Sequence, residues 1–270
     1  MNRTEYDAVQ ALSFSGMKEL LKSPAHYRHW LTAAREQTKA MLIGSATHSA
    51  VLTPSAFKDS YAQAPECDRR TKDGKAIWEA AQQALKPGQQ VLAFDDFQQV
   101  MDIADAVTRA TYEAGIELRD GDAEVPLVGK DRETPIKGIP DFISAADHFI
   151  YDLKTTSEGV TAGAALRTIL NNRYHVQAAH YIRLAHCHRS DVEGFRVIMV
   201  EKDAPFSVAI YQLTGEVLEA GRKECERAYA LYDQCVAEDR WPTLLERDGV
   251  VSLDTMPGSK SKGSPATLSF

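Results

Sequence analysis

Acidic and basic side chains occur at short spacing in the middle of the sequence, where residues 138–156 read GIPDFISAADHFIYDLKTT. Asp141 lies in the first part of this stretch, and Asp152 and Lys154 lie in the second. Charged groups rarely stand beside apolar residues without a reason. Carboxylates are oxygen ligands that Mg²⁺ prefers, and a nearby lysine can hold or deprotonate an attacking water. A metal-dependent hydrolytic site is one interpretation, and an exposed hairpin with ordinary surface charges is the other.

Two apolar runs are expected to position these three residues. Residues 136–143 and 149–153 flank a polar Ala-Ala-Asp-His turn, a pattern that predicts a β-hairpin. Alternate residues of a strand point to the same face, so Asp152 and Lys154 should lie side by side while Leu153 faces the opposite way. The hairpin is therefore expected to bring both carboxylates and the lysine together.

The order P-D, about ten residues, and then D-L-K resembles the core motif of the PD-(D/E)XK nuclease superfamily. The resemblance implies that Asp141, Asp152 and the carbonyl of Leu153 hold one or two Mg²⁺ ions, for which Mn²⁺ could substitute. It also implies that Lys154 positions and activates the water.

A helix expected over residues 174–186 carries polar residues on one face. Gln177 and Tyr181 are one turn apart, and Tyr174 precedes Gln177 by three residues. A plain amphipathic helix would place Leu or Ile at these positions, so this face is expected to line a polar site. The Q-x-x-x-Y pattern after D-x-K is similar to that of RecB- and RecE-type nucleases. This likeness implies that Gln177 and Tyr181 orient the phosphate or the bound water.

A further helix, expected over residues 41–52, contains His48 one turn after Gly44 and Ser45. Small residues at this spacing let a ligand or another backbone approach, although a lone histidine is more often structural. The segment is similar to the region before the catalytic core in RecE-type exonucleases, where a histidine lies near the metal site. That likeness implies a role for His48 at the metal.

The densest basic cluster, CDRRTKDGK, contains Arg69, Arg70, Lys72 and Lys75. Arginine binds phosphates through paired hydrogen bonds, so the cluster could hold a DNA backbone, and a solvated loop is the alternative. A similar pattern in RecE-type sequences favours DNA contact. The dipeptide Asp-Gly at residues 73–74 predicts a turn, with a helix over residues 76–85 after it.

A third acidic ligand is expected from Glu124, on a strand predicted over residues 123–128. Its alternating apolar neighbours indicate a half-buried position. In the superfamily an acid before the P-D strand often completes the metal site, and Glu124 is the nearest match. Glu117 and Glu133 are alternatives, and Glu133 ranks last because it lies in the polar turn DRETP.

Composition limits the class of protein. A hydrophobic content of 44% and a charged content of 26% are ordinary for a soluble globular domain. The absence of a long apolar run or a signal peptide predicts a cytoplasmic protein rather than a membrane protein. The net charge of −7 argues against unspecific coating of DNA, but not against DNA as a substrate. The four cysteines are too scattered for a zinc ribbon, a disulfide framework or an iron–sulfur cluster.

The expected order of elements is helix, three strands, helix, two strands, helix, preceded by short helices. These short helices include one over residues 13–21, with Ser15 as its N-cap, and one that begins at Pro24. The order predicts an α/β protein with a mixed central sheet flanked by helices. The resemblance identifies this arrangement with the restriction-endonuclease-like core of the superfamily.

The chain is expected to form one nuclease domain over residues 1–254. Residues 1–94 should be a mainly helical elaboration, and residues 95–240 should be the catalytic core. Residues 255–270 are small, polar and rich in Pro and Gly, which predicts a disordered tail.

The resemblance covers roughly residues 13–240 and points to the RecE-like exonucleases of phage and prophage recombination. It implies a Mg²⁺-dependent exodeoxyribonuclease that degrades linear double-stranded DNA from 5′ ends and leaves 3′ overhangs. It also implies a ring-shaped homo-oligomer and a single-strand annealing protein as partner. One departure is Ile139, which stands before P-D where RecE-type proteins often have a basic residue.

Two alternatives remain. One is another nuclease of the superfamily, either an endonuclease or an exonuclease that prefers single strands. The other is a catalytically idle DNA-binding scaffold of the same fold. A decayed site would have lost some of its residues, yet the sequence keeps all of the following: Asp141, Asp152, Lys154, Gln177 and Tyr181.

Overall fold

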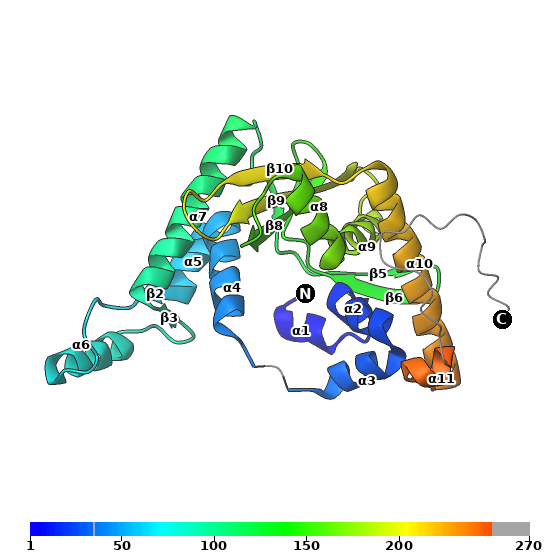
Figure 1. Ribbon diagram of the computed structural model, residues 1–270, viewed down its shortest axis with the longest axis horizontal. Helices are drawn as coiled ribbons and strands as arrows, with labels where there is room; N and C mark the ends of the chain where they lie inside the picture. Colours follow the sequence, from blue (N-terminus) through cyan, green and yellow to red (C-terminus); the bar gives the residue numbers. More distant parts are fainter. Residues whose placement is uncertain (35, 250–270) are drawn as a thin grey trace.

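A mixed five-stranded sheet forms the centre of the computed structural model, which describes residues 1–34 and 36–249 (Figure 1). The strand order is β10-β9-β8-β7-β4. The central pair, β8 (Phe149–Thr156) and β9 (Gly194–Glu201), is parallel, and the outer pairings are antiparallel. The outer strands are β10 (Val208–Gln212), β7 (Phe142–Ser144) and β4 (Gly121–Ala123). The predicted α/β class with a mixed central sheet is confirmed.

Strand β8 is buried on both faces, as expected for a strand with a parallel neighbour and helices on each side. On one face, Ile150 packs into a cluster with helices α9 (Tyr174–His186), α10 (Gly215–Glu238) and α2 (Phe14–Lys22). On the other face, Tyr151 and Leu153 pack with residues of α7 (Phe94–Glu113). The sheet is therefore the middle layer between two helical layers.

The predicted hairpin forms as β7 and β8, which pair antiparallel at Phe142↔Tyr151 and Ile143↔Ile150. The predicted first strand, residues 136–143, is wrong as a single element, because it divides at Ile139-Pro140-Asp141. Its first part belongs to β6 (Thr134–Gly138), which pairs with β5 (Leu127–Asp131) in a separate sheet. Since proline has no backbone N–H to give to a ladder, the break falls at the P-D dipeptide. Five strands thus lie between α7 and the next helix, instead of three.

The N-terminal helices are tied to this second sheet. Strand β1 (Leu12–Ser13) pairs parallel with β6, and helix α1 (Arg3–Ala8) precedes it. Helix α2 is capped by Ser13, whose hydroxyl accepts from the N–H of Gly16, so the prediction of Ser15 as N-cap is wrong. Helix α3 (Pro24–Thr32) begins at Pro24, as predicted. Lys137 of β6 donates to the backbone carbonyls of Tyr6, Asp7 and Val9, which holds the end of α1 against the sheet.

An arm extends from the rest of the protein between α4 (Lys39–Leu52) and α7. The arm carries α6 (Lys72–Gln83) at its tip and projects from the parallel strands β2 (Tyr61–Gln63) and β3 (Gln90–Leu92) (Figure 1). These strands and α5 (Pro54–Ser60) pack with α4 and α7 in one apolar cluster. The predicted turn at residues 73–74 is wrong, because Thr71 caps α6 and its hydroxyl accepts from the N–H of Gly74. A Cβ at Gly74 would lie 1.9 Å from the carbonyl oxygen of Asp68, so only glycine fits there.

The remaining helices are α8 (Ala162–Asn171) and α11 (Leu244–Asp248). Within residues 1–34 and 36–249, no helix is both long and apolar enough to cross a membrane. The division into an elaboration over 1–94 and a core over 95–240 stays a prediction. The predicted tail, residues 255–270, lies outside the described residues.

Candidate active site

Asp141 lies where the chain leaves the second sheet and enters β7. One carboxylate oxygen, Oδ2, accepts the backbone N–H of Leu153 at 2.8 Å and lies 3.3 Å from Nδ1 of His48. His48 comes from α4, so helix α4 and strand β8 both face this carboxylate. The side chains remain 15% and 24% exposed for Asp141 and His48, so both can be reached from solvent.

Asp152 and Lys154 project from the same face of β8, as the strand spacing predicts. Lys154 Nζ lies 2.5 Å from Oδ2 of Asp152, and Gln177 donates to Oδ1 at 2.8 Å. The Asp152 side chain is fully buried, whereas Lys154 is 16% exposed. Leu153 packs into the α7 cluster on the opposite face, which confirms the predicted alternation.

Helix α9 supplies the polar face predicted from its sequence. Gln177 contacts Asp152, and the ring of Tyr174 lies 5.0 Å from Lys154 Nζ, a cation–π contact. Tyr181 approaches Gly138 so closely that a Cβ there would lie 2.7 Å from its ring. Burial raises the pKa of the Tyr181 hydroxyl, and the negative charges of Asp152 and Asp141 raise it further. Tyr181 is therefore a neutral hydrogen-bonding group, and it lies near both carboxylates.

The two carboxyl groups have opposite electrostatic environments. Burial works to raise the pKa of Asp141, but His48 and Lys154 outweigh it and hold that pKa at about 2. Burial raises the pKa of Asp152 to about 6. The positive charge of Lys154 offsets the effect of burial only in part, and the negative charge of Asp141 raises the pKa further. As pH falls, Asp152 is therefore the first of the two carboxyl groups to take up a proton.

The donor atoms at the site fit a divalent cation. Asp152 Oδ2 is buried and, within the described residues, accepts no aligned hydrogen bond despite the nearby Lys154. A buried carboxylate with too little compensating charge is stabilised by a cation, and carboxylates are typical Mg²⁺ ligands. No group of three His, Cys, Asp or Glu side chains among residues 1–34 and 36–249 is arranged as a complete set of ligands. An ion here would take Asp141 and Asp152 as protein ligands and would need further donor atoms to complete its shell.

Glu124 does not occupy the expected strand position. Strand β4 ends at Ala123, and Glu124 is exposed and has a φ of 50°. The half-buried strand prediction is therefore wrong; Pro126 cannot donate to a ladder, and β5 starts only at Leu127. The backbone N–H of Glu124 donates to the Asp141 carbonyl at 3.0 Å, so Glu124 still lies beside the site. Its role as a metal ligand stays a prediction; the alternatives Glu117 and Glu133 are exposed as well.

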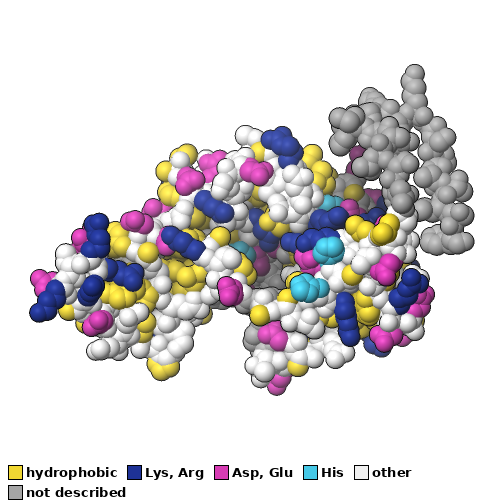
Figure 2. All heavy atoms as spheres, turned by 60° about the horizontal axis from the view of Figure 1, so that its bottom comes forward, with side chains coloured by type: hydrophobic (Ala, Val, Ile, Leu, Met, Phe, Trp, Pro, Cys, Tyr) yellow, Lys and Arg dark blue, Asp and Glu magenta, His cyan; other side chains and the backbone are white. Residues whose placement is uncertain are grey.

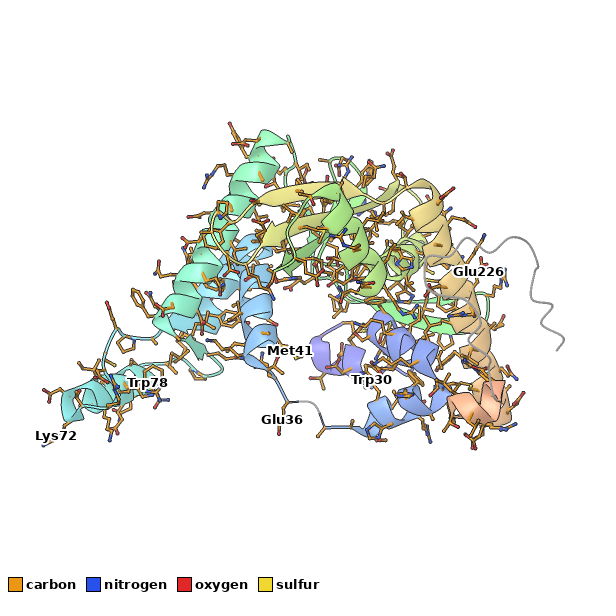
Figure 3. All side chains as sticks on the ribbon, viewed as in Figure 1. Trp30, Glu36, Met41, Lys72, Trp78 and Glu226 are labelled. Atoms are coloured by element: carbon orange, nitrogen blue, oxygen red, sulfur yellow. The ribbon has the colours of Figure 1, made fainter. Side chains whose placement is uncertain are left out.

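The basic cluster lies on the arm and not beside the carboxylates. Arg69 stacks on Trp78, with 4.2 Å between the guanidinium carbon and the ring centroid, and Arg70 pairs with Asp68 at 3.0 Å. Lys72 and Lys75 lie exposed on the first turns of α6. Figure 3 shows Lys72 and Trp78 at the opposite end of the molecule from Glu226 of α10. Contact of these residues with DNA stays a prediction.

A large hollow of about 1290 Å³ adjoins the site. Tyr181, Gly138 and Ile139 line its end near the carboxylates, while Phe14 and Trp30 belong to the N-terminal side. On the face drawn in Figure 2, Lys and Arg side chains lie around a recess near the middle of the molecule. Sequence reasoning did not identify this space, because its walls come from segments far apart in the chain.

The model of one protein family, "PDDEXK-like domain of unknown function (DUF3799)", matches residues 13–248. No curated protein matches the chain. A solved structure from Eubacterium rectale, named "Putative exonuclease", is 14% identical, has a TM-score of 0.62, and aligns over 95% of this chain and 96% of its own. A "phage related exonuclease" from Haemophilus somnus 129PT is 14% identical with a TM-score of 0.37, over 87% of this chain and 99% of its own. At this identity, the first of these shows a shared fold.

Proposed function

The chain belongs to the family of PDDEXK-like domains (DUF3799), and on that premise we propose that it is a metal-dependent exodeoxyribonuclease acting on linear double-stranded DNA. The family match confirms the resemblance to PD-(D/E)XK nucleases, whose fold implies a nucleic-acid substrate. The observation that carries the proposal is the meeting of Asp141, Asp152 and Lys154 at one place, with Gln177 hydrogen-bonded to Asp152.

The contacts of each side chain indicate its role in the proposed reaction. Gln177 and Lys154 hold the Asp152 carboxylate in one orientation, while His48 and the Leu153 N–H hold that of Asp141. A divalent ion such as Mg²⁺ or Mn²⁺, held by Asp141, Asp152 and the Leu153 carbonyl with His48 or Glu124, would stabilise negative charge developing on the phosphate. The Tyr181 hydroxyl orients the phosphate by hydrogen bonding.

Lys154 acts in its charged form. Burial works to lower the pKa of Lys154, but the adjacent Asp152 and Asp141 outweigh burial and raise it. At neutral pH the group is therefore an ammonium, which can donate to the attacking water and stabilise phosphate charge but cannot remove a proton. Lys154 therefore positions the attacking water rather than deprotonating it.

The finer features of the proposal follow the RecE-like resemblance. They are digestion from 5′ to 3′, 3′ overhangs for recombination, a ring-shaped homo-oligomer and a single-strand annealing partner. The Eubacterium rectale neighbour, whose name contains the word exonuclease, supports an exonuclease over an endonuclease.

The test uses linear duplex DNA labelled at one 5′ end, with Mg²⁺ or with a chelator, beside a closed circular duplex. We expect wild type to release labelled mononucleotides from the linear DNA only, and only with Mg²⁺. Lys154→Ala should lose this activity by about 10²-fold or more, because the water loses its donor. Lys86→Ala, which removes an exposed lysine paired with Asp59, is the matched control and should behave as wild type.

Other outcomes would contradict the proposal. Cleavage of the circle would indicate an endonuclease, and preference for a labelled single strand would indicate a single-strand exonuclease. Binding of the linear duplex without degradation under any metal would indicate an idle scaffold. Release of label only after most of the strand is degraded would reverse the proposed polarity.

A further inference from the structure

Lys18 is a half-buried cation near the site that sequence reasoning did not select. It lies in α2, one turn after Phe14, and its Nζ is 5.6 Å from the centroid of the Phe14 ring. It forms no ion pair within the part of the chain that the structure describes; the adjacent Glu19 pairs with Lys22 at 2.8 Å. A half-buried charge in this position costs free energy unless another charge compensates it.

The other charges near Lys18 are mostly positive. Burial lowers the pKa of Lys18, and although Glu19 opposes this, Lys22, Lys154 and Arg173 add repulsion. Four cations from α2, β8 and the start of α9 thus act on one small region. Three of them have an acidic partner: Lys22 has Glu19, Lys154 has Asp152, and Arg173 has Glu224. Among these described cations, Lys18 alone has none, so an anion from outside the chain would stabilise it.

The position of Lys18 indicates which anion this is. On one side it is close enough to Lys154, the lysine of the candidate active site, to feel its charge. On the other side it contacts Phe14, which lines the hollow of about 1290 Å³ beside the site. Lys18 itself does not line the hollow, but a DNA strand that runs from the carboxylates toward the Phe14 side of the hollow would come close to its ammonium group. The negative groups spaced along such a strand are its phosphates, which lysine binds as a compact point charge.

We propose that Lys18 binds a phosphodiester of the DNA strand being cut, next to but distinct from the phosphate that is hydrolysed. The inference rests on the proposed nuclease function and names a residue that positions the substrate. In this role Lys18 holds the strand in register with Asp152 and Lys154 and takes no part in the chemical step.

The test compares three variants on the same helix with wild type: Lys18→Ala, Lys18→Arg and Lys22→Ala. Lys18→Ala should raise KM for linear duplex DNA about tenfold and leave kcat nearly unchanged, because it removes a charge-assisted hydrogen bond to the bound substrate. The association constant for DNA, measured by fluorescence anisotropy without metal, falls as salt rises. The magnitude of the slope of its logarithm against the logarithm of the salt concentration should be smaller by about one in Lys18→Ala. Lys18→Arg should restore both values, since it keeps the charge.

Lys22→Ala is the matched control, because it removes a lysine one turn further along α2 that already has an acidic partner. It should keep the KM and the salt slope of wild type. Lys18→Ala should melt at the wild-type temperature or above it, since it removes a repelled cation. The rise in KM should be the same on duplexes with 5′-hydroxyl ends, because the group bound is an internal phosphodiester.

Several results would overturn the inference while leaving the proposed function intact. One is a KM of Lys18→Ala equal to that of Lys22→Ala. Another is a melting temperature of Lys18→Ala low enough to account for its weaker DNA binding. A third is a rise in KM that occurs only on duplexes with 5′-phosphorylated ends. A fall in kcat at constant KM would place Lys18 in the chemical step and overturn its assignment to positioning. If wild type degrades no linear DNA with any divalent metal, the proposed function and this inference both fail.

Discussion

The protein carries charged residues in two contrasting settings, the candidate active site on β8 and the arm that ends in α6. At the site, Asp152 is fully buried, and its partners Lys154 and Gln177 are held by the sheet and by α9. On the arm, Arg69, Lys72 and Lys75 are exposed, and the guanidinium of Arg69 stacks on Trp78. The same residue types therefore act in different ways. Buried charges interact strongly and shift one another's pKa values, whereas exposed charges interact weakly through water and are screened by salt.

The contrast extends to the surrounding structure. The site lies between two apolar clusters that pack on opposite faces of the sheet, so its geometry depends on most of the chain. The arm is joined to the rest of the protein by the short pair β2 and β3, and its helix projects from them (Figure 1). Changes at the site should therefore alter chemistry, changes in the core should alter stability, and changes on the arm should alter only association with DNA.

The largest expected effect comes from Asp152→Asn. The variant keeps the shape of the side chain but loses the negative charge that would hold a cation and Lys154, so the rate of Mg²⁺-dependent degradation should fall by about 10²-fold or more. The measurement is the initial rate on linear duplex DNA. Asp147→Asn is the control from the same hairpin, where the carboxylate binds Tyr151 and Arg196 away from the site, and it should stay within a few-fold of wild type. Full activity of Asp152→Asn would show that the chemistry lies elsewhere.

The second effect is a loss of stability in acid through His180, which is fully buried. His180 Nε2 lies 3.1 Å from the carbonyl of Lys137 and must donate to it, so Nδ1 accepts from the Tyr229 hydroxyl at 2.7 Å. Burial lowers the pKa of this imidazole from 6.5 to about 4. As pH falls below 6.5 the unfolded chain takes up a proton that the folded chain does not. The free energy of unfolding should therefore decrease, by about 2 kcal/mol at pH 5.

Chemical denaturation of wild type and His180→Gln at several pH values measures this effect. The variant lacks the titrating group, so its stability should depend less steeply on pH between 6.5 and 4. If the variant does not fold, titration of the His180 ring in wild type by NMR gives the same information. Equal pH dependence of the two proteins, or a normal imidazole pKa, would contradict the prediction.

The smallest effect is expected from a variant in which Arg69, Arg70, Lys72 and Lys75 are all alanine. Its affinity for duplex DNA should fall at low salt, and the salt slope of binding should decrease by roughly one for each phosphate that is no longer neutralised. The value of kcat and the melting temperature should change little, because the contacts of Arg69 with Trp78 and of Arg70 with Asp68 lie within the arm, away from the carboxylates. A variant with Arg222→Ala and Lys223→Ala, two exposed cations on α10, tests whether loss of positive charge elsewhere on the surface has a similar effect for each charge removed. An equal loss of affinity in that control would show that the arm has no special part in DNA binding. A fall in kcat in the arm variant would show that the arm also affects the chemical step.

Local spacing predicted most of the candidate site. The alternation of Asp152, Leu153 and Lys154 and the one-turn spacing of Gln177 and Tyr181 depend only on strand and helix geometry, and both predictions hold. Predictions that depend on where an element ends were less successful. The strand expected through Glu124 stops at Ala123, and α6 begins before the Asp-Gly pair, because caps and prolines decided those ends.

The sequence by itself determined the identity of the candidate groups and the faces on which they lie, since these follow from residue type and from the periods of strand and helix. The tertiary structure alone decided which groups meet. It brought His48 of α4 to Asp141, placed Lys18 of α2 among other cations near Lys154, and gave Asp141 and Asp152 opposite pKa shifts. These properties depend on burial and on distances between segments far apart in the chain, which no local pattern encodes.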